Sequence, residues 1–379
     1  MEYRSSGPVY CPSSYWRKIK CFELTIYVCQ PVIFQLKILA YPIPEGCCHV
    51  LLGGTGNGKT LILETIAGLR PIASGEIWTD EHNITKLSPE KRFISYVPQD
   101  LALFPHLNVE KNIFYSHRFK KNQSRTSKEI SEIIECMQLE GILHRTIHNL
   151  SGGEQQRVAL VRAFASGNKV LLLDEPFSAL HYSMKRTLWS LLSDMQKKYG
   201  LSILLVTHDL EEAFFLADDV SVLHQGRILQ TGTKEDVFYN PNSIEVTKIT
   251  GHYNYFSGKV LDVIDNHCLV NFAKLGANLR IKNNGFAPHE EVSMAIRTSN
   301  IDIIPACNDL SNLPNIIICK IKSIYETSHY QQIVLVLDKQ VHHNRDDILV
   351  DVKKNMKKFE IGQKVIVSFP EDAIHVFKE

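Results

Sequence analysis

Residues 53–60 constrain the fold of this chain more than any other part of the sequence. They read Gly-Gly-Thr-Gly-Asn-Gly-Lys-Thr, which fits the phosphate-loop pattern G-x-x-x-x-G-K-[ST]. An apolar run at 49–52 precedes the loop, and a segment predicted to be helical, 60–69, follows it. A strand, this loop and a helix in that order are the context in which the pattern binds phosphate. The alternative, a glycine-rich turn before a helix, does not account for this combination.

The residue types in this loop suit the phosphate chain of a nucleotide. Glycines let the backbone curl so that consecutive N–H groups point at phosphate oxygens, and the helix N-terminus adds partial positive charge. Lys59 supplies a charge for the β- and γ-phosphates, and the Thr60 hydroxyl is placed to bind Mg²⁺. The residues predicted to hold the nucleotide are Gly53, Gly54, Thr55, Gly56, Asn57, Gly58, Lys59 and Thr60.

Two further apolar runs end in polar residues that could act on a bound phosphate. The run 170–173 leads into Asp174 and Glu175. We expect Asp174 to hold Mg²⁺ through water, and Glu175 to face the γ-phosphate and orient or deprotonate the attacking water. The run 202–206 leads to His208, which we expect to contact the γ-phosphate, although a histidine at a strand end is more often structural.

Gln99 and a second glycine motif complete the set of candidates. The Gln99 amide could bridge Mg²⁺ or the attacking water to a moving segment, and the alternative is an ordinary glutamine in a turn. Residues 150–157 read Leu-Ser-Gly-Gly-Glu-Gln-Gln-Arg and precede a predicted helix. A serine hydroxyl, glycine amides and a helix N-terminus form an anion site, with Ser151 and Gly153 as its candidates. The alternative is a capping serine followed by a turn.

The 379 residues favour two or three domains. From 21 to 240 the short apolar runs suit strands buried on both faces of a mostly parallel sheet. Residues 1–20 are predicted to be an N-terminal extension, and 250–379 a β-rich barrel or sandwich. Helices are expected at 60–69, 128–139, 153–165 and 209–217, and β-rich strands at 292–296, 333–337 and 365–369.

Composition excludes several classes. The 42 basic and 41 acidic residues give a net charge of +1, which does not support bulk binding of nucleic acid or of a membrane surface. Nine cysteines without a C-x-x-C pair favour reduced thiols. No run reaches the roughly 18 apolar residues of a membrane span, the nearest being 24–36, and no signal peptide is evident. Any membrane role is therefore expected to come through a partner protein.

The motifs stand in an order that resembles the ATPase subunits of ABC transporters: a phosphate loop at 53–60, a glutamine loop at Gln99, a signature at 150–154, an acidic strand at 170–175 and a switch histidine at His208. The resemblance covers about 30–240. It implies a P-loop NTPase fold with a helical subdomain, followed by a smaller OB/TOBE-like β-rich domain. It also implies ATP and Mg²⁺ as cofactors. The metal would be held by Thr60, Gln99 and Asp174, and catalysis would rest on Glu175, His208 and Gln99.

The same resemblance implies how such a subunit would work. Two ATPase domains, from this chain or a paralogue, would pair head to tail, so that Ser151 and Gly153 of one close on the nucleotide at Lys59 of the other. Closure would move helices of membrane permease subunits, which a solute-binding protein serves indirectly, and hydrolysis would reopen the pair. The protein is therefore expected at the cytoplasmic face of the cell membrane as a peripheral subunit, with no nucleic-acid partner.

Finer features resemble the importer branch of this family. The segments 89–92, 97–99 and 103–107 look like those of ATPases for oxyanion, sugar, polyamine and ferric-iron uptake, and 61–68 is most like the molybdate/tungstate subunits. The tail resembles a TOBE/MOP-type domain, in which Met-Ala-Ile-Arg at 294–297 matches an "IRPE" segment except that Thr298 and Ser299 replace Pro-Glu. Molybdate or tungstate is the favoured cargo; sulfate, ferric iron, sugar and polyamine are alternatives. We also expect the tail to bind an oxyanion or sense its level.

Three positions depart from the family pattern. His181 stands where Ser-Ala-Leu is usually followed by Asp, which weakens the expected contact across the dimer. The aromatic residue that should stack on adenine is missing near Gln30 and Pro31, and Tyr27 and Phe34 are the nearest candidates. Gly54 replaces the commoner Pro, which glycine geometry tolerates.

Two other functions fit parts of the sequence. One is a soluble ABC ATPase of repair or translation, but this chain has one set of motifs and no heptads. The other is a nucleotide-binding module without hydrolysis, suggested by His181 and opposed by the presence of Lys59, Glu175 and His208.

Overall fold

The computed structural model describes residues 19–26, 36–38, 46–72, 74–79, 82–118, 126–305, 315–327, 330–337, 347–354 and 358–378. The chain divides into two compact units, residues 1–234 and 235–379. Of the predicted extension 1–20, only Ile19 and Lys20 are described, and they begin the first strand. The adenine-stacking candidates Tyr27 and Phe34, and the expected position near Gln30 and Pro31, lie outside the described residues.

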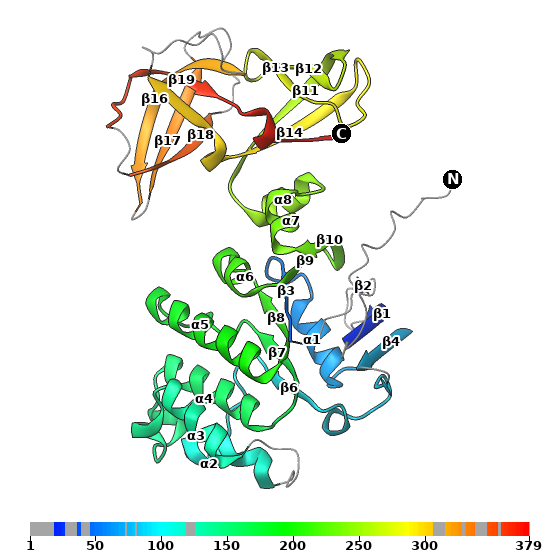
Figure 1. Ribbon diagram of the computed structural model, residues 1–379, viewed down its shortest axis with the longest axis vertical. Coiled ribbons are helices and arrows are strands. Elements are labelled where there is room, and N and C mark those ends of the chain that lie inside the picture. Colours follow the sequence, from blue (N-terminus) through cyan, green and yellow to red (C-terminus); the bar gives the residue numbers. More distant parts are fainter. Residues whose placement is uncertain are drawn as a thin grey trace. The chain divides into compact units, whose positions relative to one another are not determined.

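The first unit is an α/β structure built on one ten-stranded sheet, with strand order β5-β4-β1-β2-β10-β9-β3-β8-β7-β6. Figure 1 shows α1 and α5 on opposite sides of β7 and β8, and α2, α3 and α4 grouped at one end of this unit. In chain order its elements are β1 (Ile19–Ile26), β2 (Leu36–Ile38), β3 (Cys48–Leu52), α1 (Lys59–Ala67), β4 (Ser74–Thr79), β5 (His82–Asn83), β6 (Ile94–Val97), α2 (Val109–Ile113), α3 (Ser127–Cys136), α4 (Gly152–Ala165), β7 (Val170–Asp174), α5 (Tyr182–Tyr199), β8 (Ser202–Thr207), α6 (Leu210–Leu216), β9 (Asp219–His224) and β10 (Arg227–Thr233).

Only part of this sheet matches the predicted parallel arrangement. Strands β9, β3, β8, β7 and β6 run parallel to one another, and β2 pairs in parallel with β10. The pairs β1–β2, β1–β4, β4–β5 and β9–β10 are antiparallel. For β9 and β10 the reason is local, because only Gln225 and Gly226 separate them and both have positive φ, at 46° and 75°. A two-residue turn of this kind makes a hairpin.

The core of the first unit joins α1 to the parallel strands. Ile62, Leu63 and Ile66 of α1 pack in one cluster with residues of β3, β7 and β8, among them Leu172 and Leu204. Strands that are buried in this way require apolar residues along their length, which agrees with the apolar runs of the sequence. The helix that carries the end of the phosphate loop is therefore anchored directly on the sheet.

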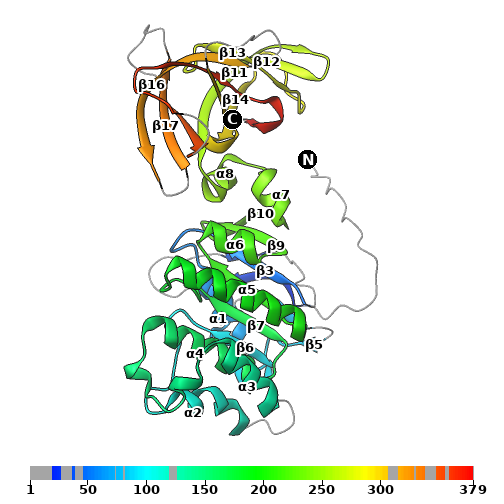
Figure 2. The same ribbon diagram turned by 60° about the vertical axis from the view of Figure 1, so that its left-hand side comes forward.

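The second unit is β-rich and has a core of its own. Two five-stranded antiparallel sheets, β13-β12-β11-β14-β20 and β15-β19-β16-β17-β18, contribute side chains to one apolar cluster, among them Phe256, Met294, Ile321 and Val367. Figure 2 shows both sheets of this unit. Its elements are α7 (Lys234–Tyr239), α8 (Ile244–Thr250), β11 (Tyr253–Ile264), β12 (His267–Phe272), β13 (Ala277–Lys282), β14 (Glu291–Arg297), β15 (Asp302–Pro305), β16 (Ile316–Glu326), β17 (Tyr330–Leu337), β18 (Ile348–Lys353), β19 (Lys364–Ser368) and β20 (Ile374–Lys378).

Among the described helices, none is both long enough and apolar enough to cross a membrane.

Candidate functional site

The predicted site residues follow strands that end at the same edge of the sheet. In the parallel registers Val97 of β6 lies opposite Leu173 of β7, and Leu52 of β3 lies opposite Thr207 of β8. The residues that come next at this edge are Gln99, Asp174 with Glu175, His208 and Gly53. Ligands of α/β proteins bind outside the carboxyl ends of such strands. Four separate stretches of chain therefore converge where a ligand is expected.

The phosphate loop needs glycine at specific positions. A Cβ at Gly53 would lie 2.4 Å from the Leu223 carbonyl oxygen, which is too close for any side chain. Gly56 and Gly58 have φ of 81° and 91°, in the left-handed region that favours glycine. Gly58 is also the residue from which α1 starts. The loop therefore has the curled backbone that the motif predicts.

Asn57 braces this loop against the β9–β10 hairpin. Its Nδ2 donates to the Leu223 carbonyl oxygen at 3.4 Å, and its Oδ1 accepts from the Gln225 N–H at 3.1 Å. Gly54 and Thr55 are exposed beside it. The motif predicts that Asn57 binds nucleotide, and in the structure its side chain shapes the loop.

Lys59 is buried, with its side chain 5% exposed, and it points back into the loop. Its Nζ donates to the carbonyl oxygens of Gly53 at 2.8 Å and Gly54 at 3.0 Å, and lies 3.9 Å from Glu175 Oε1. Burial lowers the pKa of Lys59, whereas Glu175 and Asp174 act in the opposite direction. The positive charge of the ammonium group therefore lies at the loop, where its attraction for a bound phosphate would be strongest.

Asp174 and Thr60 form an oxygen-rich corner beside the lysine. Asp174 is 1% exposed, and burial raises its pKa while a hydrogen bond from the Thr60 side chain lowers it. Within the described part of the chain, the buried Oδ2 of Asp174 has no hydrogen-bond partner. Carboxylate and hydroxyl oxygens are ligands that Mg²⁺ accepts. These residues fit the predicted metal.

Glu175 and His208 lie within hydrogen-bonding distance of each other. Glu175 Oε1 is 3.0 Å from His208 Nδ1, and the Glu175 N–H donates to the Val206 carbonyl oxygen at 2.9 Å. Glu175 has φ of 46°, which is unusual for a non-glycine residue and is typical of functional sites. The residue after His208, Asp209, caps α6 and accepts from Lys185 Nζ at 2.8 Å. The histidine is thus fixed between a strand end and a capped helix.

Ser151 and Gly153 begin α4 and are not among the strand-end residues. The Ser151 hydroxyl and the Glu154 carboxylate form a reciprocal capping box, so the alternative of a capping serine is realised in the structure. A Cβ at Gly153 would lie 2.8 Å from Leu180 Cδ2, so the second glycine permits close packing. Their action on a nucleotide held by another chain stays a prediction.

Gln99 lies in a tight turn directly after β6. The Leu101 N–H donates to the Pro98 carbonyl oxygen at 2.9 Å, which closes the turn around Gln99 and Asp100. Gln99 is exposed, next to the strand that ends in Asp174. Gln99 is therefore a turn glutamine, as the alternative proposed, and its contact with Mg²⁺ or with the attacking water stays a prediction.

Arg162 is a residue that the sequence did not single out. It is the only charged residue in the stretch 158–165 of α4, and it donates to the carbonyl oxygens of Leu101 and Ala102. A single arginine among apolar helical residues was the signal that could have drawn attention to it.

His181, the departure from the family pattern, occupies the N-cap position of α5. Its backbone is extended, with φ of −67° and ψ of 149°, as an N-cap requires, yet the structure describes no capping hydrogen bond from its side chain. We expect His181→Asp to stabilise the first unit by about 1 kcal/mol, because aspartate caps helix N-termini well and complements the helix dipole. Thermal denaturation of the two proteins at equal concentration measures the difference.

Two controls separate capping from charge. His181→Asn should give a similar gain without the charge, and His181→Ala should give none. A melting temperature for His181→Asp at or below that of His181→Ala would contradict the capping explanation.

Comparison with known proteins bears directly on this site. Residues 36–178 match the family model for ABC transporters. The solved structure described as dimeric MJ0796, a bacterial ABC transporter cassette, aligns with a TM-score of 0.52 and 27% identity, covering 57% of this chain and 98% of that one. The chain carries an ABC transporter ATPase domain. A second structure of that cassette, described as a post-hydrolysis state bound to ADP and Pi, aligns with a TM-score of 0.51 and the same identity and coverage.

The ABC ATPase domain accounts for the arrangement of the first unit. Its P-loop α/β fold is the one predicted, and the match to an ABC ATPase domain supports ATP as the nucleotide and agrees with ATP hydrolysis. The matched residues 36–178 include the phosphate loop, Gln99, Ser151, Asp174 and Glu175, whereas His208 lies beyond them. For the second unit the structure supports a β-rich domain without identifying it as OB-like or TOBE-like.

Proposed function

We propose that this chain is the ATP-hydrolysing subunit of an ABC importer and works as a head-to-tail dimer. The observation that carries the proposal is the convergence of Lys59, Asp174, Glu175 and His208 at one sheet edge. The similar cassette MJ0796 is described as dimeric, which supports pairing of two such domains. We assign the ATPase domain to 21–240 after an extension at 1–20, and a TOBE/MOP-like regulatory domain to 250–379.

The side chains divide the work of hydrolysis. Lys59 binds the β- and γ-phosphates by its charge, while Thr60 and Asp174 would hold Mg²⁺, which neutralises phosphate charge when bound. Glu175 orients the attacking water and accepts its proton, and His208 keeps the carboxylate in position through Nδ1. Gln99 follows β6, the strand that pairs with β7, and we infer that its amide contributes to the metal site.

The second half of each site would come from the partner copy. Ser151 and Gly153 begin a capped helix whose N-terminal amides favour an anion. We infer that they close on the γ-phosphate held at Lys59 of the other copy. His181 offers no carboxylate for the contact that the family pattern places there, so communication between the two sites should be weaker than in relatives with aspartate.

Coupling to transport rests on resemblance in the sequence. The segments 89–92, 97–99 and 103–107 favour uptake systems, with permease subunits as direct partners at the cytoplasmic face of the membrane and a solute-binding protein as an indirect one. An oxyanion, molybdate or tungstate, is the favoured cargo, with sulfate, ferric iron, sugar or polyamine as alternatives. A soluble, non-transport ABC ATPase is the second candidate.

Turnover by the purified protein tests the enzymatic part of this proposal. We expect phosphate release from ATP that requires Mg²⁺ and stops when EDTA is added, because the oxygen corner at Asp174 needs a divalent cation to hold the nucleotide. Release should rise when the permease is present. If both the isolated protein and its complex with the permease release no phosphate, this chain is a nucleotide-binding module instead.

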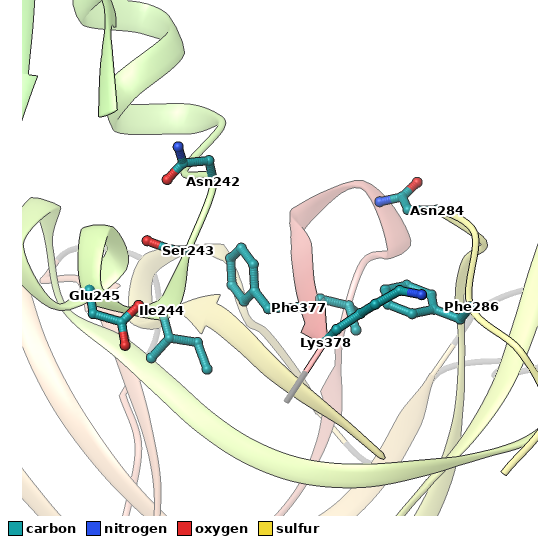
Figure 3. A pocket seen from close by; sticks show the side chains of 9 residues that line it. Asn242, Ser243, Ile244, Glu245, Asn284, Phe286, Phe377 and Lys378 are labelled. Atoms are coloured by element: carbon teal, nitrogen blue, oxygen red, sulfur yellow. The ribbon is translucent and has the colours of Figure 1, made fainter. Parts of the chain in front are cut away.

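The second unit contains a pocket that is a candidate binding site for the oxyanion. A cavity of about 530 Å³ is lined by Asn242, Ser243, Ile244, Glu245, Asn284, Phe286, Val376, Phe377 and Lys378 (Figure 3). Lys378 and the two amides are donors that an oxyanion needs. Glu245 opposes an anion there, and Lys378 Nζ already lies 2.9 Å from Glu290 Oε1.

Calorimetry decides whether the tail binds the cargo. We expect titration of molybdate or tungstate into the full-length protein to release heat, and Lys378→Ala to weaken binding about 10-fold, the loss that follows from removing one charged donor. Sulfate serves as the comparison anion. No heat with any of the three would leave the second unit as an element that braces the dimer.

A further inference from the structure

The loop that carries Gln99 contains a strained turn. Leu101 and Ala102 have φ of 64° and 41°, so two consecutive residues with side chains occupy the left-handed region. Such residues persist only where their surroundings hold them, and they cluster at functional sites. Since the Leu101 N–H also closes the turn around Gln99, the conformation of Leu101 bears directly on where Gln99 lies.

One guanidinium group holds this turn. Arg162 donates from Nη2 to the Leu101 carbonyl oxygen at 2.7 Å and from Nη1 to the Ala102 carbonyl oxygen at 2.6 Å. It also lies over the Phe104 ring, 5.3 Å from its centroid. Two charged hydrogen bonds from a planar fork favour one relative orientation of the two carbonyl groups. The left-handed turn is the conformation that presents both carbonyls to that fork.

Arg162 is itself fixed to the structure that carries the site. It lies on α4, the helix that begins with the Ser151 capping box. The next residue, Ala163, accepts a hydrogen bond at 3.0 Å from Ser95 of β6, the strand that leads to Gln99. The Arg162 guanidinium therefore joins α4, the helix that begins at Ser151, to the turn that follows Gln99.

We propose that Arg162 is a positioning residue for ATP hydrolysis. It holds the Leu101–Ala102 turn and so fixes the position of Gln99 after β6, the strand that pairs with the strand ending in Asp174. A displacement of α4 would therefore also move this turn. The proposal rests on the proposed function, because it gives Gln99 a part in hydrolysis. In this proposal Arg162 acts on hydrolysis only through the position of Gln99.

The test compares turnover with nucleotide binding. For Arg162→Met we expect the rate of Mg²⁺-dependent ATP hydrolysis to fall about 10-fold, as misplacement of a site group does, while the dissociation constant for ATP stays within about twofold. Binding is spared because Lys59 and Thr60 are untouched. Arg227→Met, at an exposed arginine of β10, is the matched control and should change neither quantity.

Two double variants separate positioning from a general packing defect. In a Gln99→Ala background Arg162→Met should cause no further loss, because the arginine acts through that glutamine. In the Arg162→Met background Ala102→Gly should restore part of the rate, since glycine adopts the left-handed conformation without the clamp. If Arg162→Met does not fold, Arg162→Lys with and without Ala102→Gly carries the same comparison.

The outcomes are distinct. Equal rates for Arg162→Met and the wild type, an additive loss with Gln99→Ala, or no rescue by Ala102→Gly would each overturn the role of Arg162. Absence of turnover in the wild type would instead contradict the proposed hydrolytic function.

Discussion

Glu175→Gln should abolish steady-state ATP hydrolysis while leaving ATP binding intact. Glutamine keeps the shape of the side chain and can still meet His208 Nδ1, but it cannot accept a proton from water. Loss of a general base lowers rates by about 10²- to 10⁴-fold. Phosphate release under saturating Mg²⁺-ATP measures the first effect, and equilibrium binding of a fluorescent ATP analogue measures the second.

The same variant reports on the dimer. If hydrolysis reopens the pair, Glu175→Gln should accumulate as a dimer with Mg²⁺-ATP, which size-exclusion chromatography with light scattering detects. Glu211→Gln is the matched control, because this glutamate lies in the first turn of α6 and its replacement makes the same charge change. Hydrolysis by Glu175→Gln at the wild-type rate would remove Glu175 from the catalytic role.

Lys59→Ala should lose ATP binding. The Lys59 ammonium is the buried positive group at the loop, with Nζ within hydrogen-bonding distance of two loop carbonyl oxygens, so its charge is poorly screened by water. We expect ATP affinity to fall by about 10²-fold or more, as is found when a buried charged partner is removed. Isothermal titration with ATP and Mg²⁺ measures the loss.

The control for this variant is Lys111→Ala, at an exposed lysine of α2. It should bind ATP as the wild type does. Thermal denaturation must accompany the measurement, because Lys59→Ala also deprives the Gly53 and Gly54 carbonyl oxygens of a donor. A folded Lys59→Ala protein with wild-type affinity for ATP would show that the glycine loop is not the nucleotide site.

Much of the candidate site could be predicted because parallel strands share one polarity. If three apolar runs are parallel strands, the residues that follow them must meet at one edge, which is where Gly53, Asp174 and His208 lie. The capping role of Ser151 was predicted too, as the alternative for that serine, whereas its reciprocal bond with Glu154 was not. Side-chain contacts with backbone carbonyls were not, because every residue has a carbonyl. The clamp by Arg162 therefore left no pairing pattern in the sequence.

The fold was less predictable where local signals were weak or absent. Helix α5 has buried residues at Leu188, Leu192 and Met195, a helical spacing, but its N-cap is His181, which is not a usual capping residue, so its start carried no signal. The antiparallel part of the large sheet depends on pairings between distant segments, such as β1 with β4, that periodicity alone cannot specify.

At Glu175 the left-handed backbone conformation places folding stability in conflict with catalysis. A non-glycine residue in this conformation lowers the free energy of unfolding by about 1–3 kcal/mol, and replacement by glycine would remove this strain. Glycine, however, carries no carboxylate to act on water. The most thermostable form of this protein and the catalytically active form therefore require different amino acids at residue 175. Directed evolution that selects for thermostability alone would favour a variant that does not hydrolyse ATP.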